Sequence, residues 1–356
     1  MTDKLRSRRW KTALNIFTIV ALVGLTYAVR RQLAETYKNF GEVELWYLLL
    51  IPLTQTLNYF AQAKLYQGLF RAVGTRFRTR SMMRLALELN FVNTVFPSGG
   101  VSGFSYINIR LRDENISTAK ATLVQIFRFI LIFVSVQILL FVGLCALAIG
   151  GKANDFAILI AGILSTLILV LTFVAAFIVG SKSRINTFFV FLTKLINGVI
   201  HIFRPKHPET ISVTRAKKAF TELHENYMQI RRDITALNRP LWWALLSVVA
   251  ELMTIYAVYV AFGQWVNIGA VILAYAVANF AGLISILPGG IGIYEALMTA
   301  VLAAGGIPAA LSLPVTVMYR ILSMAVQLIP GYFFYHRTLH AQPQIEDHLE
   351  RDTDEL

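Results

Sequence analysis

The sequence has few charged residues and only one cysteine. Charged residues make up 15% of the 356 positions, against about 25% in an ordinary soluble domain, whereas 56% are hydrophobic. A soluble protein of this length does not bury so much apolar surface with so few charges facing water. The single cysteine, Cys145, lies inside an apolar run, so no disulfide forms within the chain. Several apolar runs approach the roughly 20 residues that cross a bilayer, which predicts a polytopic membrane protein.

Motifs for binding metals, nucleotides and nucleic acids are also lacking. The six histidines show no HExxH or other paired ligand spacing, and no phosphate-binding glycine loop is present. The net charge of +13 comes from basic residues beside the hydrophobic runs, not from a basic stretch interleaved with stacking aromatics. We therefore expect no metal, no cofactor and no nucleic-acid partner, and we expect the basic surface to face a membrane.

The basic residues predict how the chain is oriented. A first apolar run at about 13–29 follows a basic start, and a second run at about 45–63 precedes a stretch with six basic and no acidic residues. The positive-inside rule places this stretch and the N-terminus in the cytoplasm, and the C-terminus follows by the same count. We expect a multi-pass protein of the cytoplasmic membrane, with further spans at about 121–149, 156–179, 241–262 and 311–335.

Two apolar segments are interrupted by Pro-Gly turns. Residues 85–109 contain FPSGGVSG between basic flanks, so we expect a re-entrant hairpin that enters from the cytoplasm. Residues 268–304 contain LPGGIG and are expected to enter from the outer side. Broken backbone at membrane depth is stable only where it is buried in protein or lines a polar cavity. Asn90 and Asn93 precede the first turn on nearly the same helix face, where they either line a polar crevice or hold the hairpin together.

A matched arginine follows each turn. Arg128 lies 31 positions after Pro97, and Arg320 lies 32 positions after Pro288. Each half is therefore a span, a broken hairpin and a span that carries one arginine. Because the hairpins enter from opposite sides, we predict an inverted repeat, in which transporters build sites near the midplane. The predicted fold is an all-α, polytopic transmembrane helical bundle with two Pro-Gly-broken re-entrant hairpins.

The charged candidates each have a structural alternative. Arg128 either lines a substrate path or reaches the cytoplasmic interface along its own helix. Arg320 lies deeper in its span, where it either lines that path or pairs with Glu295 or Glu251. Glu295 directly follows the second turn, so it either serves the site or caps the half-helix that begins there.

Residues 181–239 separate the two halves and carry eleven basic and four acidic side chains, which predicts a cytoplasmic insert. Apolar residues at alternating three- and four-residue spacing predict a helix over 213–237. This helix either pairs with a second copy as a coiled coil or packs on its own membrane domain. The oligomeric state is left open. The predicted division is an N-terminal half, 1–180, the insert, 181–239, a C-terminal half, 240–338, and a mobile acidic tail, 339–356.

The FPSGG block with Arg128, and the LPGGIGIYEA block with Arg320, resemble the lysylphosphatidylglycerol synthase transmembrane-region family over about residues 10–338. This family is also described as flippase-like. In its best understood members the membrane domain moves an aminoacylated lipid between leaflets, and a separate soluble domain makes that lipid. The resemblance implies a site built from two sets of residues: Pro97, Gly99, Gly100, Gly103 and Arg128 in the first half, and Pro288, Gly289, Gly290, Gly292, Glu295 and Arg320 in the second.

The sequence departs from the family pattern at two places. Many members have a carboxylate just after the first glycine turn, whereas here Phe104 follows Gly103, so the two halves of the site need not be symmetric. Only about 19 residues follow the last predicted span, so we expect no aminoacyltransferase activity from this chain.

We therefore expect a translocator of an anionic lipid or lipid-linked substrate. Arginine suits an anionic headgroup because its planar fork binds phosphate in a bidentate manner. A second interpretation is a non-transporting membrane protein that docks a lipid- or envelope-biosynthesis enzyme through residues 181–239. A third is an enzyme that acts within the membrane, for which Glu295 and Glu251 are the only candidate pair.

Overall fold

The computed structural model describes residues 43–96, 101–112, 116–149, 155–181, 213–284 and 290–354, with Glu114 and single positions in 20–41 and 183–187. Every element within these ranges is helical, which confirms the all-α prediction. Most of the first predicted span lies outside the described residues. So do five of the turn residues: Pro97, Gly99, Gly100, Pro288 and Gly289.

Three helices are long and apolar enough to cross a membrane: Thr118–Ile149, Ile234–Ala261 and Ala309–Thr338. They correspond to α6 (Thr118–Ile149), to the short η2 (Ile234–Leu237) with α10 (Asn238–Ala261), and to most of α13 (Ala309–Asp354). Shorter apolar stretches lie in α7 (Asp155–Val179), α11 (Ile268–Ile284) and α12 (Ile293–Ala304). The chain is therefore a membrane protein built on helices.

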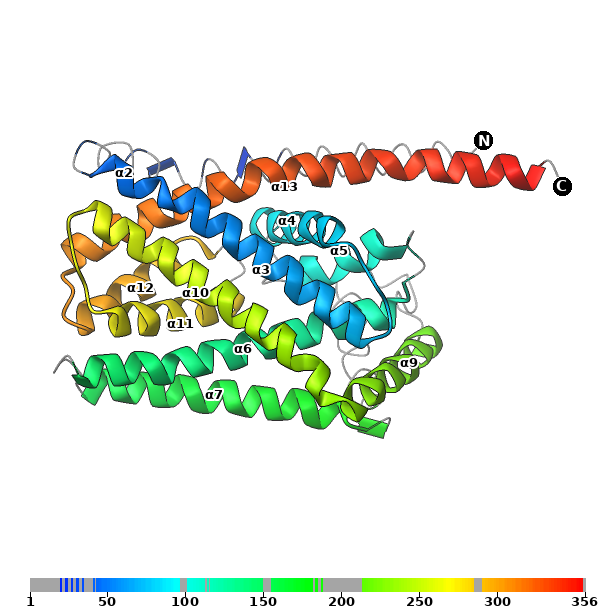
Figure 1. The fold of residues 1–356 in the computed structure, drawn as a ribbon, viewed down its shortest axis with the longest axis horizontal. Helices are drawn as coiled ribbons and strands as arrows, with labels where there is room; N and C mark the ends of the chain where they lie inside the picture. The colour runs from blue at the N-terminus through cyan, green and yellow to red at the C-terminus, as the bar shows by residue number, and fades with distance from the viewer. Residues whose placement is uncertain are drawn as a thin grey trace, which may run out of the picture.

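Helices α3 (Leu50–Ala72) and α10 run side by side across the body (Figure 1). Short α2 (Leu45–Leu48) precedes α3. Although α3 has 23 residues, it is less apolar than the three spans because its buried face carries Gln55, Asn58 and Gln62. Gly68 of α3 lies against Pro240 of α10, where an added Cβ would be 2.8 Å from the Pro240 ring. Close backbone approach thus brings the polar face of α3 directly against α10.

Each interrupted segment forms a pair of helices. Helices α4 (Thr79–Val95) and α5 (Val101–Arg112) flank the first turn, and α11 and α12 flank the second. The two pairs pack in a reciprocal manner, since α4 contacts α13 and α11 contacts α6. Each pair also contacts the arginine-bearing helix of its own half, α5 with α6 and α12 with α13.

Glycines allow both contacts between the halves. Gly331 of α13 lies so close to α4 that an added Cβ would be 2.9 Å from the carbonyl oxygen of Leu87. Gly269 of α11 lies against Gly143 of α6, and an added Cβ there would be 2.3 Å from the Gly143 carbonyl oxygen. Small residues let membrane helices approach closely without a gap. These contacts fix the helices that carry Arg128 and Arg320.

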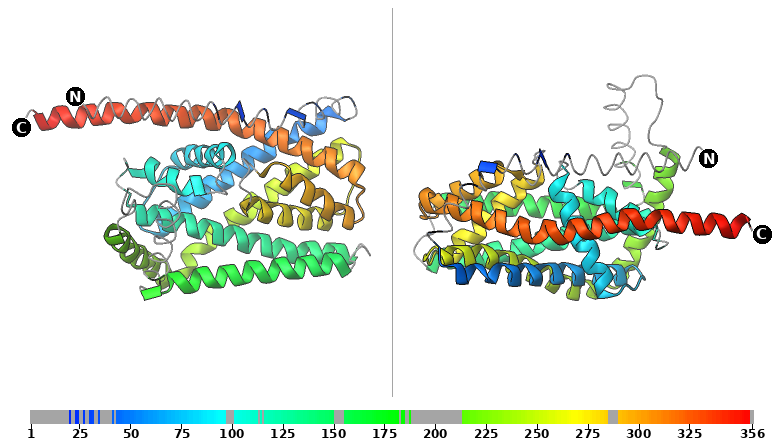
Figure 2. Two further views of the ribbon diagram at one scale, coloured as in Figure 1. Left: turned by 180° about the vertical axis from the view of Figure 1, so that it is seen from behind. Right: turned by 90° about the horizontal axis from the view of Figure 1, so that it is seen from above.

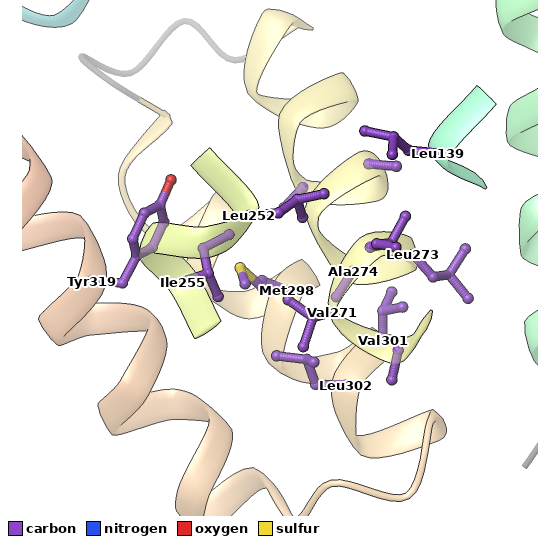
Figure 3. Packing of buried hydrophobic residues seen from close by; sticks show 14 of the residues in the cluster. Leu139, Leu252, Ile255, Val271, Leu273, Ala274, Met298, Val301, Leu302 and Tyr319 are labelled. Atoms are coloured by element: carbon purple, nitrogen blue, oxygen red, sulfur yellow. The ribbon is translucent and has the colours of Figure 1, made fainter. Parts of the chain in front are cut away.

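Each helix pair lies in its own hydrophobic cluster. The cluster around the second pair joins side chains from α6, α10, α11, α12 and α13. Figure 3 shows Leu252, Val271 and Met298 from three of these helices close to one another, with Tyr319 to one side. The cluster around the first pair includes Phe91 and Ile107, both 0% exposed. Two cores therefore hold the two helix pairs against one scaffold.

Helix α9 (Val213–Arg232) belongs to the insert and packs against α6 of its own chain. Tyr227 stacks with Phe127 at 6.3 Å between ring centroids, and Ile230 is 3% exposed. This is the arrangement expected of a helix that packs on its own membrane domain, and it uses the apolar spacing seen in the sequence.

Helix α13 does not end with its membrane span. It continues from Thr338 to Asp354 and projects beyond the body of the molecule (Figures 1 and 2). The described part of the acidic tail thus continues the last helix, and its mobility stays a prediction.

Candidate functional site

A buried ion pair lies beside the second turn. Arg320 donates from a terminal guanidinium nitrogen to Glu295 Oε1 at 2.6 Å, and the two side chains are 9% and 5% exposed. The guanidinium also lies over the Tyr294 ring, 4.6 Å from its centroid. Glu295 Oε2 accepts the backbone N–H of Gly292 at 2.6 Å. Glu295 therefore neutralises Arg320 and caps α12 at the same time.

The backbone of this turn requires glycine. Gly290 and Gly292 have φ angles of 68° and 87°, in the left-handed region that other residues adopt only with strain. Gly292 is the N-cap residue of α12, and its N–H donates to Glu295. The two glycines thus allow the backbone path that leads into α12 and places Glu295 beside Arg320.

Arg128 on α6 has a different environment. Its guanidinium carbon lies 5.5 Å from the Tyr66 ring centroid and 5.4 Å from that of Phe129. It forms no ion pair with any residue that the structure describes, and its buried Nε has no hydrogen-bond acceptor. Phe104 stacks on Phe129, with 5.7 Å between ring centroids. The first half therefore presents a half-buried guanidinium beside aromatic rings, without an ion pair among the residues that the structure describes.

Asn93 joins α4 to α5, the two helices of the first pair. Its Oδ1 accepts the Gly103 N–H at 3.0 Å and the Ser102 hydroxyl at 3.3 Å. An added Cβ on Gly103 would lie 2.6 Å from the same oxygen, so the contact requires glycine. Asn93 thus links α4 to α5, and a role for it in lining a polar crevice stays a prediction.

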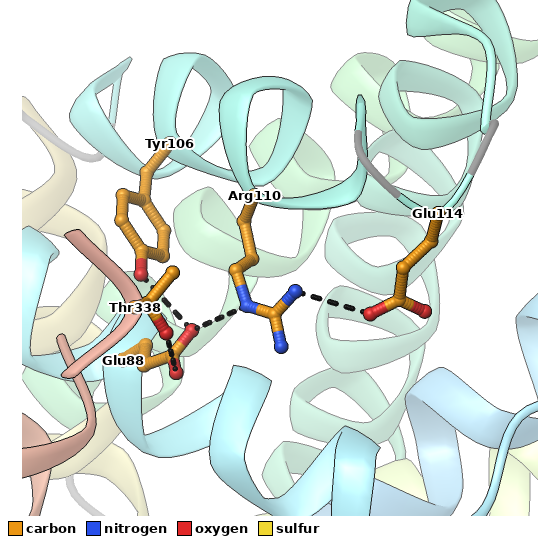
Figure 4. Close-up of polar contacts among 5 residues, drawn as sticks. All are labelled: Glu88, Tyr106, Arg110, Glu114 and Thr338. Atoms are coloured by element: carbon orange, nitrogen blue, oxygen red, sulfur yellow. Dashed lines mark hydrogen bonds and ion pairs between the residues drawn. The ribbon is translucent and has the colours of Figure 1, made fainter. Parts of the chain in front are cut away.

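A second cluster ties α4 and α5 to α13 (Figure 4). Glu88, 1% exposed, accepts from Tyr106 at 3.0 Å and from Arg110 Nε at 3.2 Å, and its other oxygen accepts from Thr338 at 2.9 Å. Arg110 also pairs with Glu114 at 3.0 Å. None of these residues is a candidate from the sequence, although Glu88 is the only acidic residue within 85–109. Its charge is neutralised within the cluster.

Polar side chains form a continuous row between α3, α4, α10 and α13, which we call the polar seam. Its members are Thr54, Gln55, Asn58, Gln62, Asn90, Thr94, Ser247, Glu251, Thr254, Tyr319, Ser323 and Gln327. On each long helix they recur every three or four residues, which places them on one face. Only Asn90 and Glu251 are predicted from the sequence. The spacing of Gln55, Asn58 and Gln62 within an apolar run is the signal that identifies the others.

Glu251 lies at the meeting point of three helices in the polar seam. It accepts hydrogen bonds from Gln55 Nε2 at 3.0 Å, from Asn58 Nδ2 at 2.5 Å and from the hydroxyl of Tyr319. No cationic side chain among the described residues contacts it. Of the two carboxylates considered for Arg320, the structure pairs it with Glu295, so Glu251 has uncharged partners alone within the described parts of the chain.

Comparison with known proteins adds the family context. The family model described as the lysylphosphatidylglycerol synthase TM region matches residues 13–331. A UPF0104 membrane protein of Methanothermobacter thermautotrophicus is 32% identical over 108 residues, which is 30% of this chain and 32% of that protein. A UPF0104 membrane protein of Pyrococcus horikoshii is 24% identical over 136 residues, 36% of this chain and 41% of that protein. The chain matches less than half the length of each relative.

Proposed function

The chain belongs to the lysylphosphatidylglycerol synthase transmembrane-region family, and from this premise we propose that it moves an anionic lipid or lipid-linked substrate between the leaflets of the cell membrane. In this proposal the two helix pairs are re-entrant hairpins of an inverted repeat that enter from opposite sides. The reciprocal packing of α4 on α13 and of α11 on α6 supports that arrangement.

The observation that carries the proposal is that the Arg128 guanidinium has no ion pair with any residue that the structure describes. A half-buried cation within a membrane protein is costly unless an anion or a polar cavity compensates it. The guanidinium lies over two aromatic rings, and cation–π contact contributes about 0.5–2 kcal/mol. A headgroup phosphate would supply the missing charge and two hydrogen bonds in bidentate geometry. Arg128 is therefore the receiving group for the headgroup, on the inner side.

Arg320 is the second binding group, on the outer side. There the phosphate competes with Glu295 for the guanidinium, while Glu295 keeps its bond to the Gly292 N–H. The polar face of α3 connects the two positions, because Gln62 is followed one turn later by Tyr66, whose ring contacts Arg128.

Translocation can be measured directly in reconstituted vesicles. The purified chain is placed in liposomes that contain a fluorescent acyl-labelled phosphatidylglycerol, and a reductant added outside bleaches only the outer leaflet. We expect the label in the inner leaflet to reach the outside at least tenfold faster than in protein-free vesicles. A phosphatidylcholine probe, which has no net negative charge, is the matched control and should move more slowly. Equal rates with and without the protein would overturn the proposal.

A further inference from the structure

Glu251 is a carboxylate that the proposed lipid path does not use. Three charged side chains lie near one another here: Glu251, Glu295 and Arg320. Tyr319 contacts Glu251 and directly precedes Arg320 in the chain. Arg320 is neutralised by Glu295. Glu251 has only three uncharged donors within the described residues. A carboxylate without a cation at membrane depth is costly, and such a group avoids the cost by taking up a proton.

A chain of hydrogen bonds ends at Glu251, and each side chain in it donates toward the carboxylate. Asn90 donates to Gln62 at 2.9 Å, Gln62 donates to Asn58 at 3.0 Å, and Asn58 donates to Glu251 at 2.5 Å. Ser247 also donates to the Asn58 oxygen, at 2.7 Å. The Asn58 oxygen is therefore occupied, and its N–H faces the carboxylate. Hard metal cations take oxygen ligands. The two amide donors hold N–H groups toward the carboxylate and offer no oxygen to a sodium ion, whereas the Tyr319 hydroxyl can also accept the hydrogen bond of a protonated Glu251.

No other charged group compensates Glu251 from the helices packed against α10. Four tyrosines on α3, α11, α12 and α13 interact with it electrostatically: Tyr59, Tyr275, Tyr294 and Tyr319. Helix α6 carries Lys120 and Arg128 as its only charged residues, and neither contacts Glu251. Helix α2 and η2 carry no charged residue. Protonation is thus the available way to neutralise this carboxylate.

We propose that Glu251 carries a proton in the same direction as the anionic headgroup, an inference that rests on the proposed translocation. With both carboxylates ionised, Glu251, Glu295 and Arg320 sum to one negative charge, and a headgroup with one negative charge makes two. A proton on Glu251 offsets the added charge. The carboxylate takes this proton from water on the side where the headgroup enters and releases it to water on the other side, so only an O–H bond forms and breaks.

The coupling can be tested in the same vesicles with a pH gradient. Valinomycin and equal potassium concentrations hold the membrane potential at zero, and a trapped pH dye reports proton movement. Because one proton and one phosphatidylglycerol move together without net charge, a gradient of about 1 pH unit shifts the ratio of lipid between leaflets by up to about tenfold. We expect the labelled lipid to accumulate in the leaflet on the alkaline side, and to carry protons with it.

Two variants separate coupling from translocation. Glu251→Gln should move lipid at one rate whatever the gradient, with no associated proton movement. Glu88→Gln makes the same chemical change in a carboxylate that is paired with Arg110, and it should keep the gradient dependence. Wild-type transport that ignores the gradient, runs toward the acidic side or follows a sodium gradient would overturn the coupling and leave translocation standing. No lipid movement by the wild type would overturn both.

Discussion

The two halves of the molecule carry one arginine each at matched positions, yet they treat it differently. In the second half Arg320 is bonded to Glu295 at 2.6 Å and both side chains are buried. In the first half Arg128 has ring neighbours, and no ion pair within the described residues. The second turn supplies Glu295, whereas Phe104 follows Gly103 in the first. The two arginines thus share a spacing in the sequence, but only Arg320 has a carboxylate partner among the described residues.

The largest expected effect is the loss of Arg320. Arg320→Gln leaves Glu295 buried with its capping bond and no cation. Breaking a buried pair by removing one partner costs about 3–5 kcal/mol. We expect the free energy of unfolding in detergent to fall by that amount, and lipid movement to stop.

The double variant Glu295→Gln with Arg320→Gln is the matched control for this loss. It removes both charges, so it should recover most of the free energy of unfolding without recovering transport. A single Arg320→Gln variant as stable as the wild type would show that the pair does not hold the second half together.

Glycine contacts test whether the halves are packed reciprocally. Gly269→Ala and Gly331→Ala each push a Cβ toward a backbone oxygen of the facing helix, at 2.3 Å and 2.9 Å. Overpacking of this kind costs about 1–3 kcal/mol, and the shorter contact at Gly269 should give the larger loss. Gly162→Ala, where nothing lies within 4 Å, is the control and should not destabilise the protein. Unfolding midpoints in detergent measure all three, and a loss at only one of the two contacts would contradict reciprocal packing.

Removal of Arg128 should separate stability from transport. Arg128→Gln loses two contacts with aromatic rings and no ion pair to a described residue. The free energy of unfolding should fall by about 1 kcal/mol, within the range of cation–π contacts. Phosphatidylglycerol movement should fall at least tenfold in the vesicle assay. A large loss of stability with unchanged transport would assign Arg128 a structural role.

A substitution at Phe104 makes the first half resemble the second. Phe104→Glu gives Arg128 a carboxylate at the position where Glu295 serves Arg320, and loses the ring stack on Phe129. The lost stacking, about 0.5–1.5 kcal/mol, is offset by the new pair, so stability should change least of all. Transport should slow several-fold because the carboxylate competes with the headgroup. Phe104→Gln is the matched control, and equal transport by both variants would argue against competition.

The sequence predicts most of the helices but few of their partners. The apolar run at 121–149 corresponds to α6 (Thr118–Ile149), and the run at 241–262 to α10 (Asn238–Ala261), because length and hydropathy are local properties. The sequence alone allows either Glu251 or Glu295 as the partner of Arg320. The choice between them depends on the direction in which α12 leaves Gly292, and that direction comes from a positive φ angle.

The hydrogen-bond partners within the polar seam could not be predicted from the sequence. Gln55 contacts Glu251, and Glu251 contacts Tyr319, across separations of 196 and 68 residues. These contacts exist because α3 packs closely on α10 and α13. The spacing on α3 alone identifies a polar face, whereas its partners follow only from the arrangement of the helices.

Lipid binding to the purified protein tests the difference between the two arginines most directly. Native mass spectrometry would count phosphatidylglycerol and phosphatidylcholine molecules retained by the wild type, by Arg128→Gln, and by the double variant of Glu295 and Arg320. We predict that Arg128→Gln loses the preference for phosphatidylglycerol, and that the double variant keeps it. Retention of the preference by Arg128→Gln would contradict the assignment of Arg128 as the receiving group.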